Sequence, residues 1–508
     1  MCLRNFDRRT YIADTARAFT QHRIGKREFL RRMALAGVGF SSFATTFLGQ
    51  GRPFGGLTHV GTDLAAAETS DDVKKWLAEV SKPFKGTTIR FTSEATPPTI
   101  VANQITKDEF TAVTGIDVEI EIVPLEQVLQ KATLDVQGQL GTYDLYYLDQ
   151  SWMATFAPDT IDPFEKYQSN AELAMPGFNW DDFSKPLVDG ISMYDGKMVS
   201  IPFDIPIFIL MYRKDLFDKH GIKVPTTMDE YMAAVKAIDG AERGNGIFGT
   251  TGQLKSGHYS LNCDWTAWLW GNGGSIFDAS QMFSGGDADG IAGLEYMLEL
   301  VKHMPPAATT WTWDGESQSV SQGTAGMLIS WGEFFPGFDG KDSKVVGLME
   351  AAHPPKESKL RTPEQAGFGE IPHIGHQGGS GLALSAYSKN PDAAWIYMQW
   401  VCSPDVMARV STLGGGASPM RLSAFKDPRV LAAAKVGPGT TRHFPAIEWT
   451  INNAMGSEPD MPAWAEISNN VIPVELGKLL AGQYASPQEC MDAIKAKADE
   501  LAAPFRKS

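Results

Sequence analysis

Cysteine is scarce in this chain: Cys2, Cys263, Cys402 and Cys490 are the four among 508 residues. They lie far apart in the sequence, so no C-x-x-C metal-binding pair is present. So few cysteines also exclude the dense disulfide framework by which small secreted domains compensate for a small core. The sequence therefore predicts a fold held together by its apolar core.

Long apolar runs and an excess of positive charge are also missing. Beyond the N-terminal region, no segment reaches the roughly 18 continuous apolar residues of a transmembrane helix. The net charge is −15, and no basic stripe follows the N-terminus, which argues against a nucleic-acid partner. With 43% hydrophobic and 21% charged residues, the composition is that of a globular protein, and 508 residues predict two or three domains or lobes.

The N-terminal region differs in charge from the remainder of the chain. Residues 1–67 contain ten Lys and Arg against four Asp and Glu, and the remainder contains 35 against 56. Basic residues and then a modest apolar stretch occupy Gly25–Gly49, and Ala65-Ala66-Ala67 fits an A-x-A cleavage site. This is the architecture of an export signal, so we expect residues 1–67 to be removed and the mature chain to be periplasmic. The alternative is an amphipathic surface helix.

The export route is indicated by Lys26–Arg31, "KREFLR". This run resembles a twin-arginine signal, with Lys26 where the first arginine is expected. The resemblance implies a twin-arginine-like route, and the general route is the alternative.

Strand and helix patterns alternate after the N-terminal region. Gly86–Ala95, Ile116–Leu125 and Tyr143–Pro158 each contain a short β-branched, alternating or apolar run. Helical spacing separates them, first over Thr99–Gly115 and then in "LEQVLQKATLDVQGQ". This order predicts a parallel sheet and an α/β fold class, in which ligands lie beyond the ends of the strands.

The stretch Gly196–Phe217, "GKMVSIPFDIPIFILMYRKDLF", combines features that a central strand avoids. Pro202 and Pro206 remove ladder donors, and Asp204 is a lone carboxylate in an apolar run. Both features suit a segment at a sheet edge that passes from one lobe to another. We therefore expect a crossing segment here, with Asp204 facing a ligand cleft.

Four blocks, taken in order, resemble a known family. They are "YDLYYLDQSWMATFA", "GKMVSIPFDIPIFILMYRKDLFDKHGIKVPTTMDEYMAAV", "WGNGGSIFD" with "GTAGMLISWGE", and "GGSGLALSAYSKNPDAAWIYMQWVCSPDVMARV". With the helical C-terminal block they cover most of residues 84–502. The chain resembles the periplasmic solute-binding proteins of ABC importers, in the sugar-binding branch that includes maltose- and trehalose-binding proteins.

The resemblance implies a type II periplasmic binding protein fold, in which two α/β lobes enclose a ligand cleft. The N-terminal lobe is expected to comprise residues 84–203 and 378–430, and the C-terminal lobe residues 204–377 and 431–508. The implied function is to capture a sugar or related polyhydroxylated solute and deliver it to the permease subunits of an ABC importer. The resemblance also implies a monomer that needs no cofactor and no metal.

Sugar recognition requires acceptors for hydroxyls and flat apolar surfaces for C–H faces. Glu94 and Asp149 each end a predicted strand, and Asp204 interrupts one, so we expect all three carboxylates to bind ligand hydroxyls. Each could instead cap a helix or lie on the surface. Trp331, which ends the strand in "LISWGE", is the predicted stacking residue.

Further tryptophans fall in the blocks that the resemblance associates with the cleft. Most buried tryptophans belong to the core, so at least half of these are expected to be core residues. The set is Trp265, Trp268, Trp270, Trp311, Trp313 and Trp331.

Three further residues are expected to bind ligand. Gly379 and Ser380 lie in the second crossing, where glycine lets a backbone approach a ligand. Members of the resembling family often have tryptophan in the place of Ser380, so one stacking surface is missing here. Arg421 follows a Gly-rich turn and suits hydroxyls or a carboxylate, with a surface ion pair as the alternative.

Catalytic and metal-binding patterns are weak. Glu370, His373 and His376 have loose metal-like spacing, but they lie in a Pro/Gly loop that does not align them, so we interpret the match as chance. The sequence contains no G-x-S-x-G, P-loop or H-E-x-x-H motif. A secreted glycoside-processing enzyme that uses cleft carboxylates is the alternative function. Turnover of sugar distinguishes the enzyme from the binding protein.

Overall fold

A computed structural model describes residues 69–506, except 168–169, 367–368 and 414–417. The predicted export signal, its cleavage site and Cys2 lie outside the described residues. Within these ranges, no helix combines the length and hydropathy that crossing a bilayer requires. Cys263, Cys402 and Cys490 are buried free thiols.

The first sheet begins with three parallel strands, as the alternating pattern predicts. They are β1 (Thr88–Glu94), β2 (Asp117–Val123) and β3 (Leu145–Asp149), with β1 between the other two. The connection from β1 to β2 consists of α5 (Pro97–Ile105), a π-helical segment (Thr106–Thr111) and α6 (Ala112–Thr114). The connection from β2 to β3 is α7 (Leu125–Gly138). These crossovers position the carboxyl ends of the strands at one edge.

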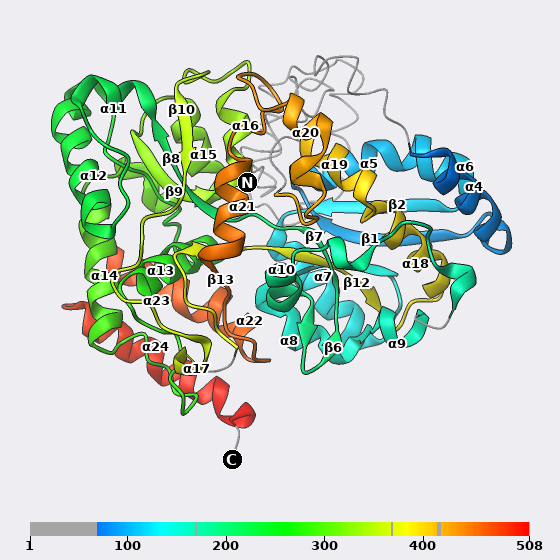
Figure 1. Cartoon of the computed structure of the whole chain (residues 1–508). Helices are drawn as coiled ribbons and strands as arrows, with labels where there is room; N and C mark the ends of the chain where they lie inside the picture. Colours follow the sequence, from blue (N-terminus) through cyan, green and yellow to red (C-terminus); the bar gives the residue numbers. More distant parts are fainter. Residues whose placement is uncertain (1–68, 168–169, 367–368, 414–417, 507–508) are drawn as a thin grey trace, which may run out of the picture. The chain divides into compact units, whose positions relative to one another are not determined.

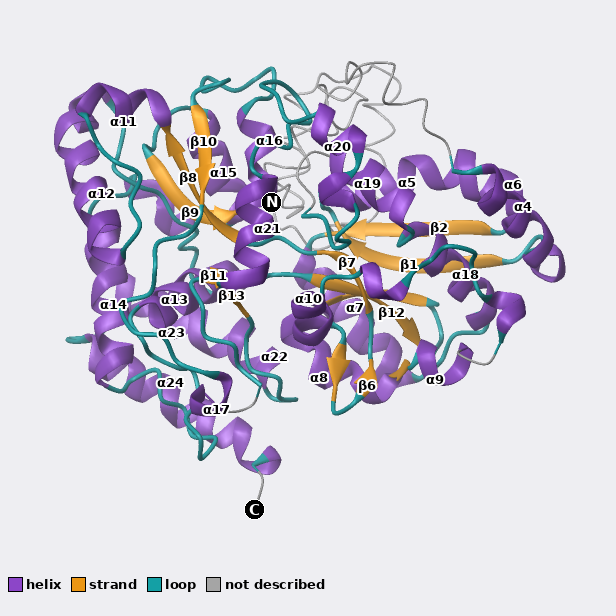
Figure 2. Ribbon diagram, in the orientation of Figure 1, coloured by secondary structure: helices purple, strands orange, loops and turns teal. Residues whose placement is uncertain are grey.

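Strands from later in the sequence complete the first sheet (Figure 2). β12 (Ser380–Ser385) runs antiparallel to β3, and β4 (Thr160–Ile161) and β7 (Ile201–Asp204) both pair antiparallel with β12. The sheet order is β2-β1-β3-β12-β4, with β7 also on β12. β3 and β12 are buried along their whole length, which places them in the centre of the core.

The second sheet is antiparallel, in the order β10 (Met349–Ala352), β8 (Phe208–Arg213) and β9 (Met327–Trp331). Figure 1 shows it in a group of helices separate from the first sheet. These helices are α11 (Lys214–His220), α12 (Met228–Glu242), α13 (Tyr259–Gly271), α14 (Ala288–Val301) and α15 (Trp313–Ser321). All thirteen residues of α13 are buried, so Trp265, Trp268 and Trp270 are core residues, as expected for half of the set.

The chain passes from the first sheet to the second through Ile205-Pro206-Ile207, between β7 and β8. β7 pairs with β12 alone among the described strands, so it is an edge strand, and the prolines fit this position. Ile207 forms an antiparallel bridge with Gln377, and the Gly378 N–H donates to the Pro206 carbonyl at 3.0 Å. The chain therefore passes from one sheet to the other at Ile205–Ile207, and the segment around Gln377 and Gly378 lies against this passage.

The remaining elements complete the two groups. β11 (Gly375–His376) pairs in parallel with β13 (Met455–Gly456), and β5 (Met193–Tyr194) pairs with β6 (Lys197–Met198). The short helices are α8 (Met153–Phe156), α9 (Pro163–Tyr167), α10 (Lys185–Ile191), α16 (Phe335–Phe338) and α17 (Pro363–Ala366). The later helices are α18 (Pro391–Val401), α19 (Pro404–Leu413), α20 (Pro428–Ala432), α21 (Phe444–Asn453), α22 (Trp464–Glu466), α23 (Ile472–Leu480) and α24 (Pro487–Ala502).

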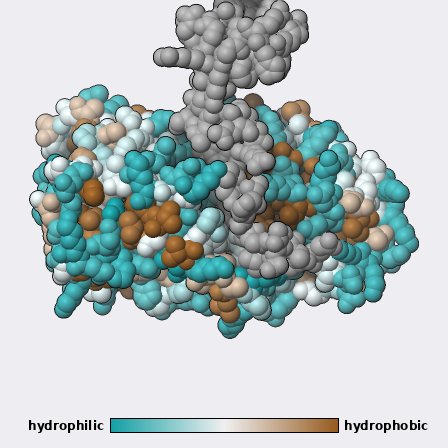
Figure 3. Space-filling view, turned by 90° about the horizontal axis from the view of Figure 1, so that it is seen from above, coloured by the Kyte–Doolittle hydropathy of each residue, from teal (hydrophilic) through white to brown (hydrophobic). Residues whose placement is uncertain are grey.

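In the helical C-terminal block, α23 ends at Leu480 and α24 begins at Pro487, so Gly482 lies in the connection between them. Thr227 caps α12, because its side chain accepts from the Glu230 N–H at 3.2 Å. Figure 3 shows one face of the molecule, where hydrophilic residues predominate and hydrophobic ones form small separate patches.

Candidate binding site at the crossings

Three of the predicted site residues lie in one row across the first sheet. Ser380, the first residue of β12, is the register partner of Asp149 on β3 and of Asp204 on β7. The pairing of β12 with β7 is irregular between Ser380 and Gly381, next to this row. The row lies where β3 and β7 end and the chain leaves the sheet. The structure therefore brings Asp149, Asp204 and Ser380 together.

Asp204 is completely buried, and among the described residues only its Oδ2 has a partner with hydrogen-bond geometry. Its Oδ2 accepts a hydrogen bond from the Tyr147 hydroxyl at 3.0 Å. Its Oδ1 is buried and has no partner among the described residues. Burial raises the pKa of Asp204 above its ordinary value, and the hydroxyls of Thr96 and Tyr147 oppose the shift. A buried oxygen without a donor is costly unless something absent from the free chain supplies one.

Two carboxylates from helical segments beside the second sheet, Glu333 and Asp314, repel Glu94, and Asp204 in turn repels Glu333. Glu333 follows β9, and Asp314 lies in the first turn of α15. Burial raises the pKa of Glu333 well above its ordinary value, and repulsion from Asp204 and Asp314 adds to the effect. Burial likewise raises the pKa of Glu94, at the end of β1, and Glu333 and Asp204 are the strongest repelling neighbours. We call Glu94, Asp204, Asp314 and Glu333 the acidic cluster.

Trp331 is the last residue of β9, as the sequence predicts, and it lies beside the second crossing. Its indole N–H donates to Gln253 Oε1 at 3.2 Å, and its ring packs edge-on against Phe208 at a centroid distance of 4.2 Å. Gly378 approaches the ring so closely that an added Cβ would lie 2.2 Å from a ring carbon. Trp331 is 4% exposed and packs within the core, and only glycine at position 378 leaves room for its ring.

Gly379 brings the two crossings into contact. A Cβ at this position would lie 2.8 Å from the Cα of Ile205, in the first crossing. The Gly379 carbonyl accepts from the Gln150 N–H at 2.9 Å, next to the end of β3. Glycine is therefore required here for backbone packing between the crossings.

Asp149 lies in the row but its carboxylate caps the following turn. Oδ1 accepts from the Ser151 N–H at 2.9 Å and from the Ser151 hydroxyl at 2.7 Å. Burial raises the pKa of Asp149 to about 7, and the Ser151 hydrogen bonds oppose the shift. These contacts match the alternative that the sequence left open for Asp149, namely that it caps the segment after its strand.

Arg421 has contacts that are structural, and none joins it to the acidic cluster. The side chain is fully buried, with Nε donating to the Cys402 carbonyl at 2.8 Å and Nη1 to the Asn179 carbonyl at 2.9 Å. Its guanidinium lies 3.9 Å from the ring centroid of Phe183 and 3.5 Å from the Asp182 carboxylate. The Gly-rich turn before Arg421 suggested a ligand contact, but the side chain instead fixes neighbouring loops.

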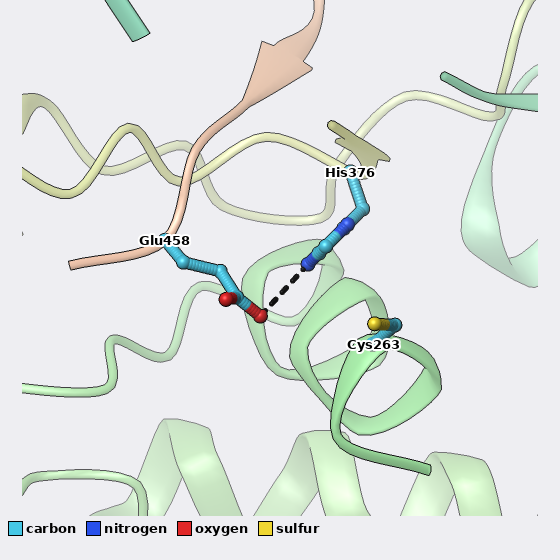
Figure 4. Close-up of side chains that lie close together, drawn as sticks. All are labelled: Cys263, His376 and Glu458. Carbon is cyan, nitrogen blue, oxygen red and sulfur yellow. Dashed lines mark hydrogen bonds and ion pairs between the residues drawn. The ribbon is translucent and has the colours of Figure 1, made fainter. Parts of the chain in front are cut away.

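A second buried polar group lies beyond the second crossing (Figure 4). Cys263, His376 and Glu458 place their ligand-type atoms within 4.8 Å of one another, which is a spacing that a metal could use. His376 Nε2 lies 3.1 Å from Glu458 Oε1. The three side chains come from α13, β11 and the segment after β13.

Glu458 is already saturated with donors. Its carboxylate accepts from the Tyr259 hydroxyl at 2.7 Å, from the Asn262 amide at 2.6 Å and from the Trp464 indole at 2.8 Å. Burial also raises the pKa of the Cys263 thiol well above its ordinary value, which disfavours the thiolate that binds metals. These contacts favour a structural network over a metal centre.

The loose spacing of Glu370, His373 and His376 does not produce a shared site. Glu370 accepts from the Trp270 indole at 2.6 Å, and His373 Nδ1 lies 3.0 Å from Glu357 Oε1. His376 instead faces Glu458. Each of the three residues thus has its own partner, in agreement with the interpretation as chance.

Sequence reasoning missed Glu333, Asp314 and Tyr147. Glu333 lies two residues beyond Trp331 in the same "LISWGE" motif, and that adjacency was a usable signal. Asp314 and Tyr147 carried no comparable signal, because only the packing of the two sheets brings them close.

A surface hollow beside α12 contains none of these residues; Ile222, Val224, Glu230, Ala233 and Ala237 are among those that line it.

Most of the chain is similar to known bacterial binding proteins. Residues 106–438 match the profile of a family described as bacterial extracellular solute-binding protein. A probable amino-acid ABC transporter periplasmic-binding protein of Sinorhizobium fredii is 25% identical over 390 residues, 75% of this chain and 83% of that one. A mannitol-binding protein of Pseudomonas aeruginosa is 24% identical over 423 residues, 76% and 87% of the two chains.

Solved structures show the same fold. An ABC transporter solute-binding protein of Agrobacterium radiobacter, in complex with ribitol, superposes with a TM-score of 0.73 at 26% identity. The alignment covers 83% of this chain and all of that one. The chain therefore has the two-lobed α/β fold that the sequence predicts.

Proposed function

Because this chain belongs to the bacterial extracellular solute-binding proteins, we propose that it captures a sugar or polyol at the crossings between its lobes. The carrying observation is the buried Asp204, whose Oδ1 has no donor in the described part of the chain. A ligand hydroxyl supplies that donor in a charge-assisted hydrogen bond, which is the strong kind. The bound solute is delivered to the permease subunits of an ABC importer.

The proposed ligand contacts are divided between the two sheets. Glu94, Asp204 and Ser380 act from the first sheet, and Glu333 and Trp331 from the second. Asp149 positions the turn after β3, and Gly379 keeps the crossings in contact. The names of two similar proteins, a mannitol-binding protein and one solved with ribitol, support a polyol as the solute.

The proposed lobes are residues 84–203 with 378–430, and residues 204–377 with 431–508. The two crossings near residues 203 and 378 support this division, because they connect the sheets there. A third connection between the lobes lies near α20, in support of the boundary at residue 430. The Gly437 N–H, shortly after it, donates at 3.2 Å to Asp339, which follows α16. The protein acts as a monomer in this proposal.

Titration calorimetry tests the ligand class. The mature chain is titrated with ribitol, mannitol, erythritol, glucose and maltose, beside a thermal melt of each mixture. A ligand that binds the native state alone raises the melting temperature. Binding of at least one of these compounds is expected, and no binding of any would overturn the proposal.

Two further assays concern the alternatives. Incubation with nitrophenyl glycosides releases nitrophenol if the carboxylates catalyse hydrolysis, and we expect no release above that of a Glu333→Gln, Asp204→Asn double variant. N-terminal sequencing of exported material is expected to begin near residue 68, and a mature chain that begins at Met1 contradicts export with cleavage.

A further inference from the structure

The ring of Trp331 packs against both crossings. Phe208, which follows the first crossing, is its register partner on β8, and the two rings meet edge-on with their centroids 4.2 Å apart. Gly378, in the second crossing, lies against the same ring, since an added Cβ would lie 2.2 Å from a ring carbon. A change in the tilt of Trp331 would therefore shift the backbone two residues before Ser380, the register partner of Asp204.

Two buried hydrogen bonds in series hold the indole of Trp331. Its N–H donates to Gln253 Oε1 at 3.2 Å, and Gln253 Nε2 donates in turn to Asp264 Oδ1 at 3.0 Å. The backbone N–H of Gln253 donates to the other oxygen of Asp264, Oδ2, at 3.1 Å. Gln253 is fully buried and Asp264 nearly so, so solvent has little access to these bonds. We call Asp264, Gln253 and Trp331 the relay.

The two ends of the relay fix the amide of Gln253 in one orientation. An ionised carboxylate only accepts hydrogen bonds, and an indole N–H only donates one. The amide must therefore turn its NH2 group to Asp264 and its oxygen to Trp331. Burial raises the pKa of Asp264 above its ordinary value, and both hydrogen bonds from Gln253 oppose the shift. The carboxylate is thus costly to bury, and its two acceptors orient Gln253.

We propose that Asp264 is a positioning residue of the binding site: through Gln253 it sets the tilt of Trp331, and Trp331 holds the two crossings in the arrangement that binds ligand. The effect on affinity rests on the proposed function, because it concerns the same site. Asp264 acts through the relay and not by touching the ligand.

Asp264→Asn breaks the relay with little change in side-chain size. The carboxamide oxygen still accepts from the Gln253 backbone N–H, so its NH2 group faces the side-chain amide of Gln253. That amide must turn over to offer its oxygen, and its own NH2 group then faces the indole N–H of Trp331, donor against donor. The bond to the indole is lost, and ligand binding is expected to weaken about tenfold.

Adding Gln253→Glu to Asp264→Asn rebuilds the relay with its polarity reversed. A carboxylate at position 253 accepts both from the indole of Trp331 and from the carboxamide at position 264. The bond from the backbone N–H of position 253 remains, and the net charge equals that of the wild type. The double variant is therefore expected to bind ligand within about threefold of the wild-type chain.

Two measurements follow the relay. Titration calorimetry gives the affinity for ribitol, mannitol, erythritol, glucose and maltose. Heteronuclear NMR of a chain with isotope-labelled tryptophan gives the indole N–H signal of Trp331, which the Trp331→Phe variant assigns. This signal should move upfield in Asp264→Asn, because its hydrogen bond is lost, and return in the double variant.

Glu475→Gln is the matched control. Glu475 is also a buried carboxylate, 1% exposed, but it lies on α23 and accepts from Lys478 at 2.8 Å and from the Tyr484 hydroxyl. This variant should leave both the Trp331 signal and the affinity unchanged, even where it lowers the melting temperature.

The outcomes separate the positioning role from the proposed function. If the wild type binds and Asp264→Asn binds equally well, or if the Trp331 signal does not move, the positioning role is wrong and the proposed function stands. A double variant as weak as Asp264→Asn would also overturn the relay. A lower melting temperature with unchanged affinity would make Asp264 a structural residue. If the wild-type chain binds none of the five compounds, the proposed function is overturned, and the effect on affinity with it.

Discussion

Asp204 and Glu458 are both buried carboxylates beside the crossings, but their surroundings differ. Glu458 accepts hydrogen bonds from Tyr259, Asn262 and Trp464 and faces His376. Asp204 accepts from Tyr147 and keeps Oδ1 without a donor in the described part of the chain. Glu458 therefore has its hydrogen-bond partners within the fold, whereas Asp204 Oδ1 needs a donor from a bound molecule.

The difference shows how to distinguish structural from functional burial. A buried charge that is fully hydrogen-bonded stabilises its network, and removing it leaves its donors unpaired. A buried charge with an unpartnered oxygen costs free energy in the unbound chain, and a ligand recovers that cost. Burial alone does not separate the two, because both carboxylates are nearly inaccessible to solvent.

The largest expected effect concerns Glu458. Glu458→Ala leaves the Tyr259, Asn262 and Trp464 donors unpaired, so the free energy of unfolding should fall by about 3–5 kcal/mol. Urea denaturation measures the change. Glu295→Ala, at an exposed helix position, serves as the control and should change the free energy of unfolding by less than about 0.5 kcal/mol. A loss below about 1 kcal/mol for Glu458→Ala would mean that the network is not structural.

Asp204 should show the opposite pattern. Asp204→Ala is expected to weaken ligand binding by about 1–3 kcal/mol while the melting temperature of the unbound chain stays near that of the wild type. For a neutral polyol, Asp204→Asn should be milder, because the amide keeps one acceptor. Calorimetric titration and thermal melts of both variants decide: a variant that binds normally but melts much lower would make Asp204 a structural residue.

The dependence of stability on pH sharpens the comparison at a smaller magnitude. Burial raises the pKa values of Glu94, Asp149, Asp204 and Glu333, so the folded chain holds protons that the unfolded chain releases near pH 4. As pH rises from 5 to 8, the free energy of unfolding should therefore fall, by about 1.4 kcal/mol per pH unit for each group between its two pKa values.

Acids with lowered pKa values do not obscure this window. Glu109 and Glu242 contribute stability that is complete above their unfolded pKa, near 4.5, so their change lies at lower pH. Urea denaturation at half-unit intervals measures the profile of the wild type and of Asp204→Asn. The variant should show the shallower slope, and identical slopes would mean that Asp204 does not titrate in this range.

Domain closure should give the smallest signal. Closing the lobes about the crossings near residues 203 and 378 is expected to reduce the radius of gyration when ligand is added, because the acidic cluster spans both sheets. X-ray scattering with and without ligand measures it. Glu458 should keep its partners in both states. Tight binding with unchanged scattering would count against a hinge.

The prediction of the fold succeeded because its signals are local. The alternation of strand and helix patterns from Gly86 to Pro158 depends on residues a few positions apart. The segment Pro202–Pro206 could also be recognised from the sequence, since proline lacks a backbone N–H donor wherever it occurs. These features can be predicted without knowledge of the rest of the chain.

The site was predicted only in part, for a physical reason. Sequence placed Asp204, Ser380 and Trp331 at strand ends, and the structure brings them to the crossings. It also offered Arg421, whose Nε and Nη1 instead donate to the carbonyls of Cys402 and Asn179.

The sequence alone determined the parallel strands of the first sheet, because hydrophobic period and turn residues act locally, and the order of its blocks along the chain indicated the class of the protein. Only the tertiary structure decided which buried carboxylate is satisfied. Whether Asp204 or Glu458 finds donors depends on side chains as distant in sequence as Tyr147 and Tyr259, and hydrogen bonds form between atoms that packing brings within about 3 Å. The sequence shows that a residue is a carboxylate, but the tertiary structure decides which donors lie close enough to bind it.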